Sequence, residues 1–266
     1  MHLRMLRCRD PLARVSQSSW DGIMKDYQPR MSFCHVAAAR RHQYRGDETE
    51  AVEYLALAAG GGPVLELGIG AGRLAIPLAQ RGLEVDGVDF APEMIALLRQ
   101  KAGVDTIRVV LGDFASADYP RESYAMVFVV WNSLFNLLTQ DDQIACFRNV
   151  ARHLAPDGCY VVEAYAPTYL HRLDGQQAVK VEDLSVDEVR ISVIRHDPAS
   201  QIVEQSHVSL TEQGTRFNPV VQRYAWPSEL DLMARIAGLK LRERWSDWKR
   251  HPFDAASHGH VSVYVR

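Results

Sequence analysis

Short runs rich in apolar residues recur along the first 165 positions, and segments with helical spacing separate them. Such runs are typical of strands that are buried on both faces of a sheet. They predict strands at residues 64–67, 83–88, 106–111, 124–130 and 159–165. Strands that alternate with helices predict a mostly parallel sheet with right-handed crossovers.

The segments between these strands have helical patterns with clear ends. Residues 50–59 are rich in Ala and Leu, and the Gly-Gly-Gly-Pro run at 60–63 ends them. A second helix is expected at 93–102, and an amphipathic helix at 140–154 stops at the turn 155–158. Upstream of residue 50, helices are expected at the positions 21–27 and 36–44.

The pattern changes after residue 165. Between 166 and 223 the apolar residues alternate with polar ones, which is typical of half-exposed strands. A three-stranded antiparallel meander is expected at 189–195, 202–210 and 220–224. A helix from Trp226 to Ala237 follows, with Ser228 as its expected N-cap, and two final strands are expected at 239–245 and 260–265.

A glycine-rich turn follows the first predicted strand. Gly68, Gly70 and Gly72 separate that strand from a helix, so a ligand can lie against the main chain at the carboxyl end of the sheet. A nicotinamide dinucleotide site requires a third glycine three positions after the second, and Arg73 stands there. The pattern is instead E-x-G-x-G-x-G, beginning at Glu66.

Two acidic residues stand at the ends of the next two predicted strands. Asp89 ends the second strand, where a carboxylate can accept hydrogen bonds from both hydroxyls of a ribose. Asp113 follows the third strand, where it can accept from an adenine amino group. The spacing therefore indicates a site for an adenosine-containing ligand.

In combination, these motifs resemble those of the class I S-adenosylmethionine-dependent methyltransferases, over residues 50–165 and again from Trp226 onward. The resemblance implies a doubly wound, mostly parallel seven-stranded α/β sheet that ends in an antiparallel hairpin, with an antiparallel β insertion after the fifth strand. It implies S-adenosylmethionine as cofactor and S-adenosylhomocysteine as product. The cofactor-binding residues expected from it are Glu66, Gly68, Gly70, Gly72, Asp89, Phe90, Met94, Asp113, Phe114 and Trp131.

The same resemblance suggests four parts of the chain. Residues 1–49 form an arm with cap helices, and 50–165 form the cofactor-binding core. Residues 166–225 form a lid over the methyl acceptor, and 226–266 complete the core.

Residues beyond the fourth and fifth strands are candidates for the acceptor site. Asn132 can orient an acceptor or bind the cofactor, although it can equally cap the sheet. His171 is the candidate general base, with an ordinary surface histidine as the alternative reading. Phe135, Tyr165 and Arg223 are expected to bind the substrate.

Composition narrows the function further. The 266 residues are 47% hydrophobic and 24% charged with a net charge of −3, which argues against a general nucleic-acid or membrane binder. The four cysteines form no C-x-x-C pair, and His251, His258 and His260 lack a matching third ligand, so no metal site is expected. Residues 1–19 lack the apolar stretch of a secretory signal, although a transit peptide or a disordered start remains open.

These observations favour a cytoplasmic methyltransferase, monomeric or homodimeric, that acts on a small-molecule acceptor at nitrogen, oxygen or carbon. The alternative is a protein of the same fold that binds the cofactor without transferring methyl. A dehydrogenase is a third hypothesis, which the early position of Gly72 opposes.

Overall fold

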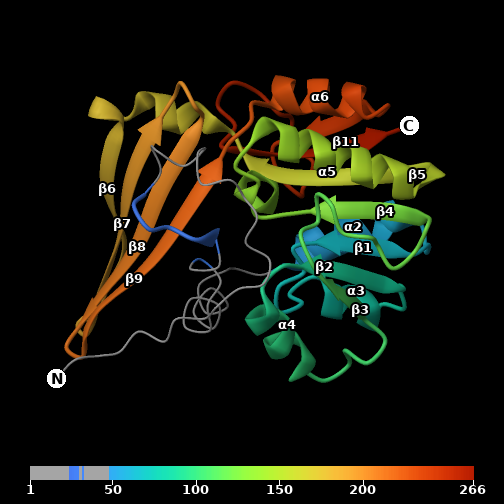
Figure 1. Cartoon of the computed structure of the whole chain (residues 1–266), viewed down its shortest axis with the longest axis horizontal. Helices are drawn as coiled ribbons and strands as arrows, with labels where there is room; N and C mark the ends of the chain where they lie inside the picture. The colour runs from blue at the N-terminus through green and yellow to red at the C-terminus, as the bar shows by residue number, and fades with distance from the viewer. Residues whose placement is uncertain (1–23, 30–31, 33–47) are drawn as a thin grey trace.

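The computed structural model describes residues 24–29, 32 and 48–266 (Figure 1). Its main sheet has the strand order β10-β11-β5-β4-β1-β2-β3. The strands are β1 (Val64–Leu67), β2 (Val85–Asp89), β3 (Arg108–Leu111), β4 (Tyr124–Val129), β5 (Leu154–Tyr165), β10 (Lys240–Trp245) and β11 (Gly259–Val265). Strands β1 to β5 pair in parallel, whereas β11 is antiparallel to both β5 and β10. The predicted α/β fold with a terminal antiparallel hairpin is confirmed.

Helices cover both faces of this sheet because successive strand side chains point to opposite sides. On β4, Val127 and Val129 pack into the apolar cluster beneath α5 and α6, whereas Met126 and Phe128 pack into the cluster beneath α2 and α3. The helices are α2 (Thr49–Ala59), α3 (Ala75–Gln80), α4 (Pro92–Arg99), α5 (Gln140–His153) and α6 (Pro227–Ile236), with 3-10 helices η3 (Ser133–Asn136), η4 (Pro167–Arg172) and η5 (Asp174–Gln176). None of the helices in the described ranges is long and apolar enough to cross a membrane.

The helix starts follow local chemistry. Thr139 caps α5 by accepting a hydrogen bond from the Asp142 amide at 3.0 Å. Ser228 is not the N-cap of α6, contrary to the expectation, because the helix already begins at Pro227 with Trp226 as its N-cap. The fixed φ of proline suits the first helical position, so the helix starts two residues earlier than the serine suggested.

The insertion after β5 is a separate antiparallel sheet of four strands, not three (Figure 1). In the order β6-β7-β8-β9, its strands are β6 (Gln177–Leu184), β7 (Glu188–Asp197), β8 (Ile202–Thr211) and β9 (Gly214–Arg223). The sequence did not reveal β6, and it placed the start of β9 six residues late. Pro219 obscured β9, because proline is tolerated in a strand at the edge of a sheet but not in a central one.

The described part of the N-terminal region touches this second sheet. Met24 to Asp26 form a bend and turn, which corrects the expected helix at 21–27 over these positions. Ser32 donates from its hydroxyl to the Pro219 carbonyl at 2.6 Å, and the Val221 amide donates to the Tyr27 hydroxyl at 3.3 Å. The arm 1–19 and the expected helix at 36–44 lie outside the described residues.

Candidate functional site

The loop from Gly68 to Arg73, here called the glycine loop, joins β1 to α3 and depends on its glycines. Gly68, Gly70 and Gly72 have φ of +75°, +55° and +78°, a region that side-chain-bearing residues rarely adopt. Space is limited as well at Gly72, where a Cβ would collide with Leu98, whereas a Cβ on Gly68 would be in ordinary contact with the Ser133 side chain at 3.4 Å. The backbone conformation therefore favours glycine at all three positions, and packing requires it at Gly72.

Asp89 lies at the carboxyl end of β2 and faces the glycine loop. Its Oδ2 accepts from the Gly70 amide at 2.7 Å and its Oδ1 accepts from the Ala91 amide at 2.9 Å. Burial raises the pKa of the Asp89 carboxyl, and these backbone amides partly offset that rise. The N-cap position of α4 is Ala91, so Asp89 ties the helix start to the glycine loop without capping the helix itself.

Glu66 is a fully buried acid in the middle of β1. Neither of its carboxylate oxygens has a partner with hydrogen-bond geometry within the described residues. Burial and then the charge of Asp89 raise the pKa of Glu66 well above its ordinary value, and the Ala75 amide only partly offsets this. A buried carboxyl with so little hydrogen bonding is costly, and a cationic or hydroxyl-bearing ligand beside it would lower that cost.

Of the remaining predicted cofactor residues, Met94 contacts the same loop, and Phe90, Asp113 and Phe114 lie at or beyond the ends of β2 and β3. The Met94 methyl lies 3.2 Å from the position that a Cβ on Gly70 would occupy. Phe90 is half-buried between Asp89 and α4. The Asp113 carboxylate accepts from the Ala115 amide at 2.8 Å beyond the end of β3. Phe114 instead packs in the apolar cluster on the α5 side of the sheet.

Two consecutive residues at the end of β4 have left-handed backbone conformations. Trp131 has φ of +51° and Asn132 has φ of +62°, a conformation that costs of order 1–3 kcal/mol each and is concentrated at functional sites. The Trp131 amide donates to Glu163 Oε2 at 2.9 Å, and the Tyr165 amide donates to Asn132 Oδ1 at 2.6 Å. The ends of β4 and β5 are thus held together by side chains.

Long-range contacts that the sequence did not indicate fix this geometry. The Trp248 indole donates to Glu163 Oε1 at 3.3 Å from the segment between β10 and β11. The Arg73 guanidinium lies 4.3 Å above the Trp131 ring, which couples the glycine loop to the end of β4. Neither pairing has a local sequence signal, because the partners are far apart in the chain.

The second sheet reaches the same place through β9. Gln222 donates from its amide to the Asn132 carbonyl at 3.3 Å and to Asn136 Oδ1 at 3.4 Å. Next to them, the rings of Phe135 and Tyr165 meet edge to face at 5.2 Å. The Tyr165 hydroxyl is buried and has no hydrogen-bond partner among the described residues.

Two other predicted site residues are engaged elsewhere. His171 is bound through Nε2 to the Tyr224 hydroxyl at 2.9 Å, and that hydroxyl also contacts His196. Arg223 is buried and donates to Glu229 at 2.8 Å and to Gln143 at 2.9 Å. The Arg223 side chain therefore connects β9 to α5 and α6.

Within the described part of the chain, no three His, Cys, Asp or Glu side chains are grouped closely enough to share a metal ion. His260 is buried and bonded to the Ser262 hydroxyl at 2.9 Å, whereas His251 is exposed and pairs with Asp247.

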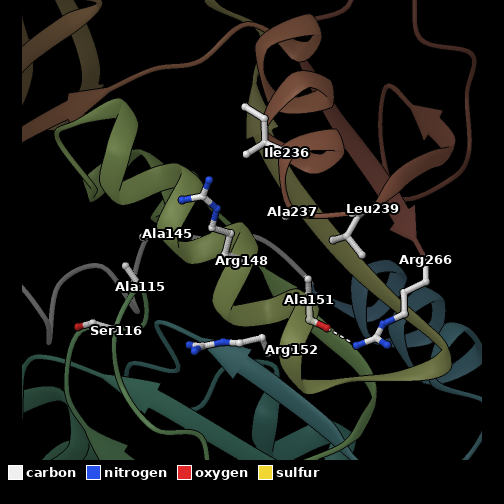
Figure 2. A pocket seen from close by; sticks show the side chains of 11 residues that line it. Ala115, Ser116, Ala145, Arg148, Ala151, Arg152, Ile236, Ala237, Leu239 and Arg266 are labelled. Carbon is white, nitrogen blue, oxygen red and sulfur yellow. Dashed lines mark hydrogen bonds between the residues drawn. The ribbon is translucent and has the colours of Figure 1, made fainter.

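A pocket of about 840 Å³ is lined by residues of α5, of the segment after β3 and of the turn from α6 to β10 (Figure 2). Arg148 and Arg152 extend from α5 at its rim, and Arg266 donates to the Ala151 carbonyl. Its lining includes none of the predicted cofactor or acceptor residues, and consists of Ala115, Ser116, Ala145, Arg148, Ala151, Arg152, Ile236, Ala237, Gly238, Leu239 and Arg266.

Comparison with known proteins shows which family has this fold and sequence. A model of the methyltransferase domain family matches residues 64–158. The solved CcbJ methyltransferase from Streptomyces caelestis is 38% identical, with a TM-score of 0.84, over 90% of this chain and 99% of that chain. The chain belongs to the class I S-adenosylmethionine-dependent methyltransferases.

Other relatives of this methyltransferase extend the comparison. The cypemycin N-terminal methyltransferase of a Streptomyces species is 27% identical over 208 residues, which is 77% of this chain and 84% of that protein. The S-adenosylmethionine-bound CalS10 of Micromonospora echinaspora, an amino pentose methyltransferase, shares the fold with a TM-score of 0.67 at 19% identity, over 87% of this chain and 96% of that chain.

The residues around the glycine loop fit S-adenosylmethionine as the cofactor of this methyltransferase. The cofactor has a cationic sulfur, an ammonium group and two ribose hydroxyls, which can satisfy a buried carboxyl that lacks a partner. Glu66 is such a carboxyl, and the carboxylate of Asp89 lies beside it. Gly68, Gly70 and Gly72 have no side chains that would keep a ligand away from the main chain of this loop.

Proposed function

We propose that this methyltransferase methylates an amine nitrogen of a small molecule held between the ends of β4 and β5 and the second sheet. Three neutral groups stand at this place, the Asn132 amide, the Tyr165 phenol and the Gln222 amide, and the nearby Glu163 carboxylate accepts from the Trp131 amide and the Trp248 indole. An amine that arrives uncharged has its own lone pair and needs no strong base, whereas an alcohol usually does. The observation that carries the proposal is that His171, the base candidate, is bound to Tyr224.

The cofactor half of the proposed site is built from β1, β2 and α4. S-adenosylmethionine supplies a methyl group that its positive sulfur already activates. Asp89 accepts the ribose hydroxyls, and Glu66 neutralises positive charge next to the glycine loop. Met94 and Phe90 pack against the adenine, and the Asp113 carboxylate accepts from its amino group. Gly68, Gly70 and Gly72 give the cofactor access to the main chain.

The acceptor half is built from β4, β5 and β9. Asn132 and the Tyr165 hydroxyl position the amine, and Phe135 forms an apolar wall behind it. Gln222 holds the end of β4 so that the acceptor nitrogen lies in line with the methyl–sulfur bond. Trp131, stacked under Arg73, separates the two halves of the site.

Four segments of the chain have separate roles in the proposed methyltransferase. Residues 1–49 cap the site, 50–165 hold the cofactor, 166–225 act as the lid that selects the acceptor, and 226–266 complete the core. The contacts of Gln222 with Asn132 and Asn136, and of Tyr27 and Ser32 with β9, support this arrangement.

We also assign the methyltransferase to the cytoplasm, as a monomer or homodimer without nucleic-acid or membrane partners. Cys146 and Cys159 are buried free thiols, which suits a reducing compartment. The net charge of −3 does not favour binding to a polyanion.

The test is transfer of a labelled methyl group to matched acceptors. The purified chain is incubated with methyl-labelled S-adenosylmethionine and with pairs of small molecules that differ only in an amine or a hydroxyl at one position. Label is expected in the amine member of a pair, together with one equivalent of S-adenosylhomocysteine. Transfer to the hydroxyl member alone would overturn the choice of nitrogen.

A further inference from the structure

On one face of the second sheet, three neighbouring rows of side chains are almost entirely apolar. Cross-strand pairing aligns side chains of one face in rows, because residues directly opposite each other point to the same side. Three neighbouring rows hold ten apolar residues in twelve positions: Val179, Val193, Ser206 and Pro219; Val181, Ile191, Val208 and Phe217; and Leu184, Val189, Leu210 and Thr215. This set is here called the apolar face.

The apolar face is exposed to a degree that is unusual for a single chain. Six of its large side chains are between 40% and 73% exposed: Val179, Val181, Leu184, Val193, Leu210 and Phe217. In Figure 1 the second sheet projects from the core, with β6 farthest from it. Contiguous apolar patches larger than a few hundred Å² are rare on monomers and mark interaction sites.

The opposite face of the same sheet is polar between the apolar rows, whereas its next row toward the core contains Ala178, Ile194 and Val220. The row between the first two apolar rows consists of Lys180, Ser192, His207 and Asn218. Gln222, also on this polar face, contacts Asn132 at the end of β4. The polar face is therefore turned toward the proposed acceptor site, and the apolar face is turned away from it.

The edge of the sheet is protected against a partner strand, although the face is not. The outer strand β6 has Lys180, Glu182 and Asp183 in sequence, and its pairing with β7 is irregular between Val181 and Asp183. Charged residues and bulges on an edge strand prevent addition of a further strand. A partner of this sheet is thus expected to pack on its face.

We propose that a second copy of this chain covers the apolar face, with the two sheets packed face to face about a two-fold axis. Strands about 4.8 Å apart and rising about 3.3 Å per residue give the three rows a footprint of roughly 350 Å². Protruding side chains bring the accessible area toward the ~800 Å² per partner of a standard interface.

Charge also favours a second copy. The adjoining row contains one cation and one anion, Arg195 and Glu204, which pair with each other within the chain. The three rows themselves carry no charged side chain, so two identical faces meet without electrostatic conflict. A strongly apolar contact of this kind is typical of homodimers, and two-fold dimers are the commonest oligomers.

Sedimentation velocity of the full chain tests the proposal. At about 20 µM, where a dimer with micromolar affinity is populated, the wild type is expected to sediment at about 60 kDa, twice its mass of 30.0 kDa. Val181→Glu and Phe217→Glu, made singly and together, are expected to convert it to the 30.0 kDa monomer. Both side chains are exposed in the single chain, so circular dichroism is expected to show an unchanged fold.

The matched control is Leu57→Glu, which replaces a side chain that is 71% exposed on α2, away from the second sheet. This variant is expected to remain dimeric. A monomeric wild type would overturn the proposal, as would a dimer that persists in both single variants. Dissociation of Leu57→Glu to the same extent as Val181→Glu would place the interface elsewhere. The result is independent of which acceptor is methylated.

Discussion

At the scale of single residues, Glu66 and Asp89 determine the electrostatics of the cofactor site. Both carboxyls are buried beside the glycine loop, and the charge of Asp89 raises the pKa of Glu66. Asp89 has backbone amides as partners, whereas neither oxygen of Glu66 has a partner with hydrogen-bond geometry in the described structure. The two acids are thus expected to respond differently to the same ligand.

Replacing Asp89 with Ala is expected to weaken binding of S-adenosylhomocysteine at least tenfold. Hydrogen bonds to a charged group contribute about 1.5–3 kcal/mol, and about 1.4 kcal/mol corresponds to a factor of ten. Isothermal titration of the folded variant measures the loss. Asp86→Asn is the matched control, since Asp86 lies on the same strand but binds Arg108 at 2.8 Å and Tyr124 at 2.9 Å. That control is expected to lose stability and keep its affinity; unchanged affinity in Asp89→Ala would refute the ribose role.

Glu66 is expected to release a proton when the cofactor binds. Its pKa in the folded protein is raised, so the unbound chain carries a proton there at a pH between the ordinary glutamate value and the raised one. In that window the free energy of unfolding falls as the pH rises, because the unfolded chain releases this proton and the folded chain keeps it. A cationic ligand favours the ionised form and displaces the proton.

Titration of S-adenosylmethionine in buffers with different ionisation enthalpies measures this proton release. Glu66→Gln is expected to abolish the release and to weaken binding. Glu53→Gln, at an exposed position on α2, is the control and is expected to release as many protons as the wild type. If Glu66→Gln released as many protons on cofactor binding as the wild type, another group would be their source.

The residues that stand at strand ends could be predicted from the sequence, whereas the contacts between them could not. Asp89 and Asp113 follow apolar runs directly, and parallel strands bring their carboxyl ends to one edge of the sheet. The left-handed backbone of Trp131 and Asn132 depends on Glu163 and Tyr165, more than 30 positions away. Local pattern contains no signal for such pairs, and it gave no indication that Arg223 would be bound by Glu229.

At the scale of elements, the junction between β9 and η3 links the two sheets. Gln222→Ala removes the hydrogen bonds from β9 to Asn132 and Asn136. A loss of about 1 kcal/mol in positioning corresponds to about a fivefold rise in the KM for the acceptor. Steady-state kinetics with the identified amine measures this change, and affinity for S-adenosylhomocysteine is expected to stay within twofold.

Gln205→Ala provides the control for this junction. Gln205 lies on the same face of the second sheet and donates to the Ser192 hydroxyl at 2.6 Å, within the sheet. Removing the Gln205 amide is expected to leave both the KM for the acceptor and the affinity for S-adenosylhomocysteine unchanged. A fall in cofactor affinity in Gln222→Ala equal to the rise in KM would indicate that β9 belongs to the cofactor site.

The strands of the main sheet could be predicted from local sequence patterns, whereas those of the second sheet could be predicted only in part. Strands β1 and β4 are buried on both faces and stand out as apolar runs between helices. On β6 the alternation of apolar and charged residues extends only from Val179 to Glu182 before the pairing becomes irregular at Asp183, and this short strand-like pattern was missed. Its partner β7 is required to show that it is a strand.

At the scale of the whole molecule, the terminal hairpin closes the sheet and contains a buried histidine. His260 on β11 is surrounded by the core, and burial followed by the charge of Arg244 lowers its pKa to about 3. Asp231 opposes this shift but does not cancel it. The side chain is therefore neutral in the folded protein over most of the acid range.

This neutral histidine is expected to reduce stability at low pH. Since the unfolded chain takes up a proton at about pH 6.5 and the folded chain does not, stability falls as the pH decreases below that value and is kept above it. With a folded-state pKa of about 3, the loss attributable to His260 at pH 4 is about 3 kcal/mol. Urea unfolding at a series of pH values measures it. In His260→Gln the free energy of unfolding is expected to decline less steeply between pH 6.5 and pH 4, whatever its value at neutral pH. His258→Gln, at an exposed position before β11, is the control and is expected to keep the wild-type slope. An unchanged slope in His260→Gln would show that carboxyl groups, not this histidine, govern unfolding by acid.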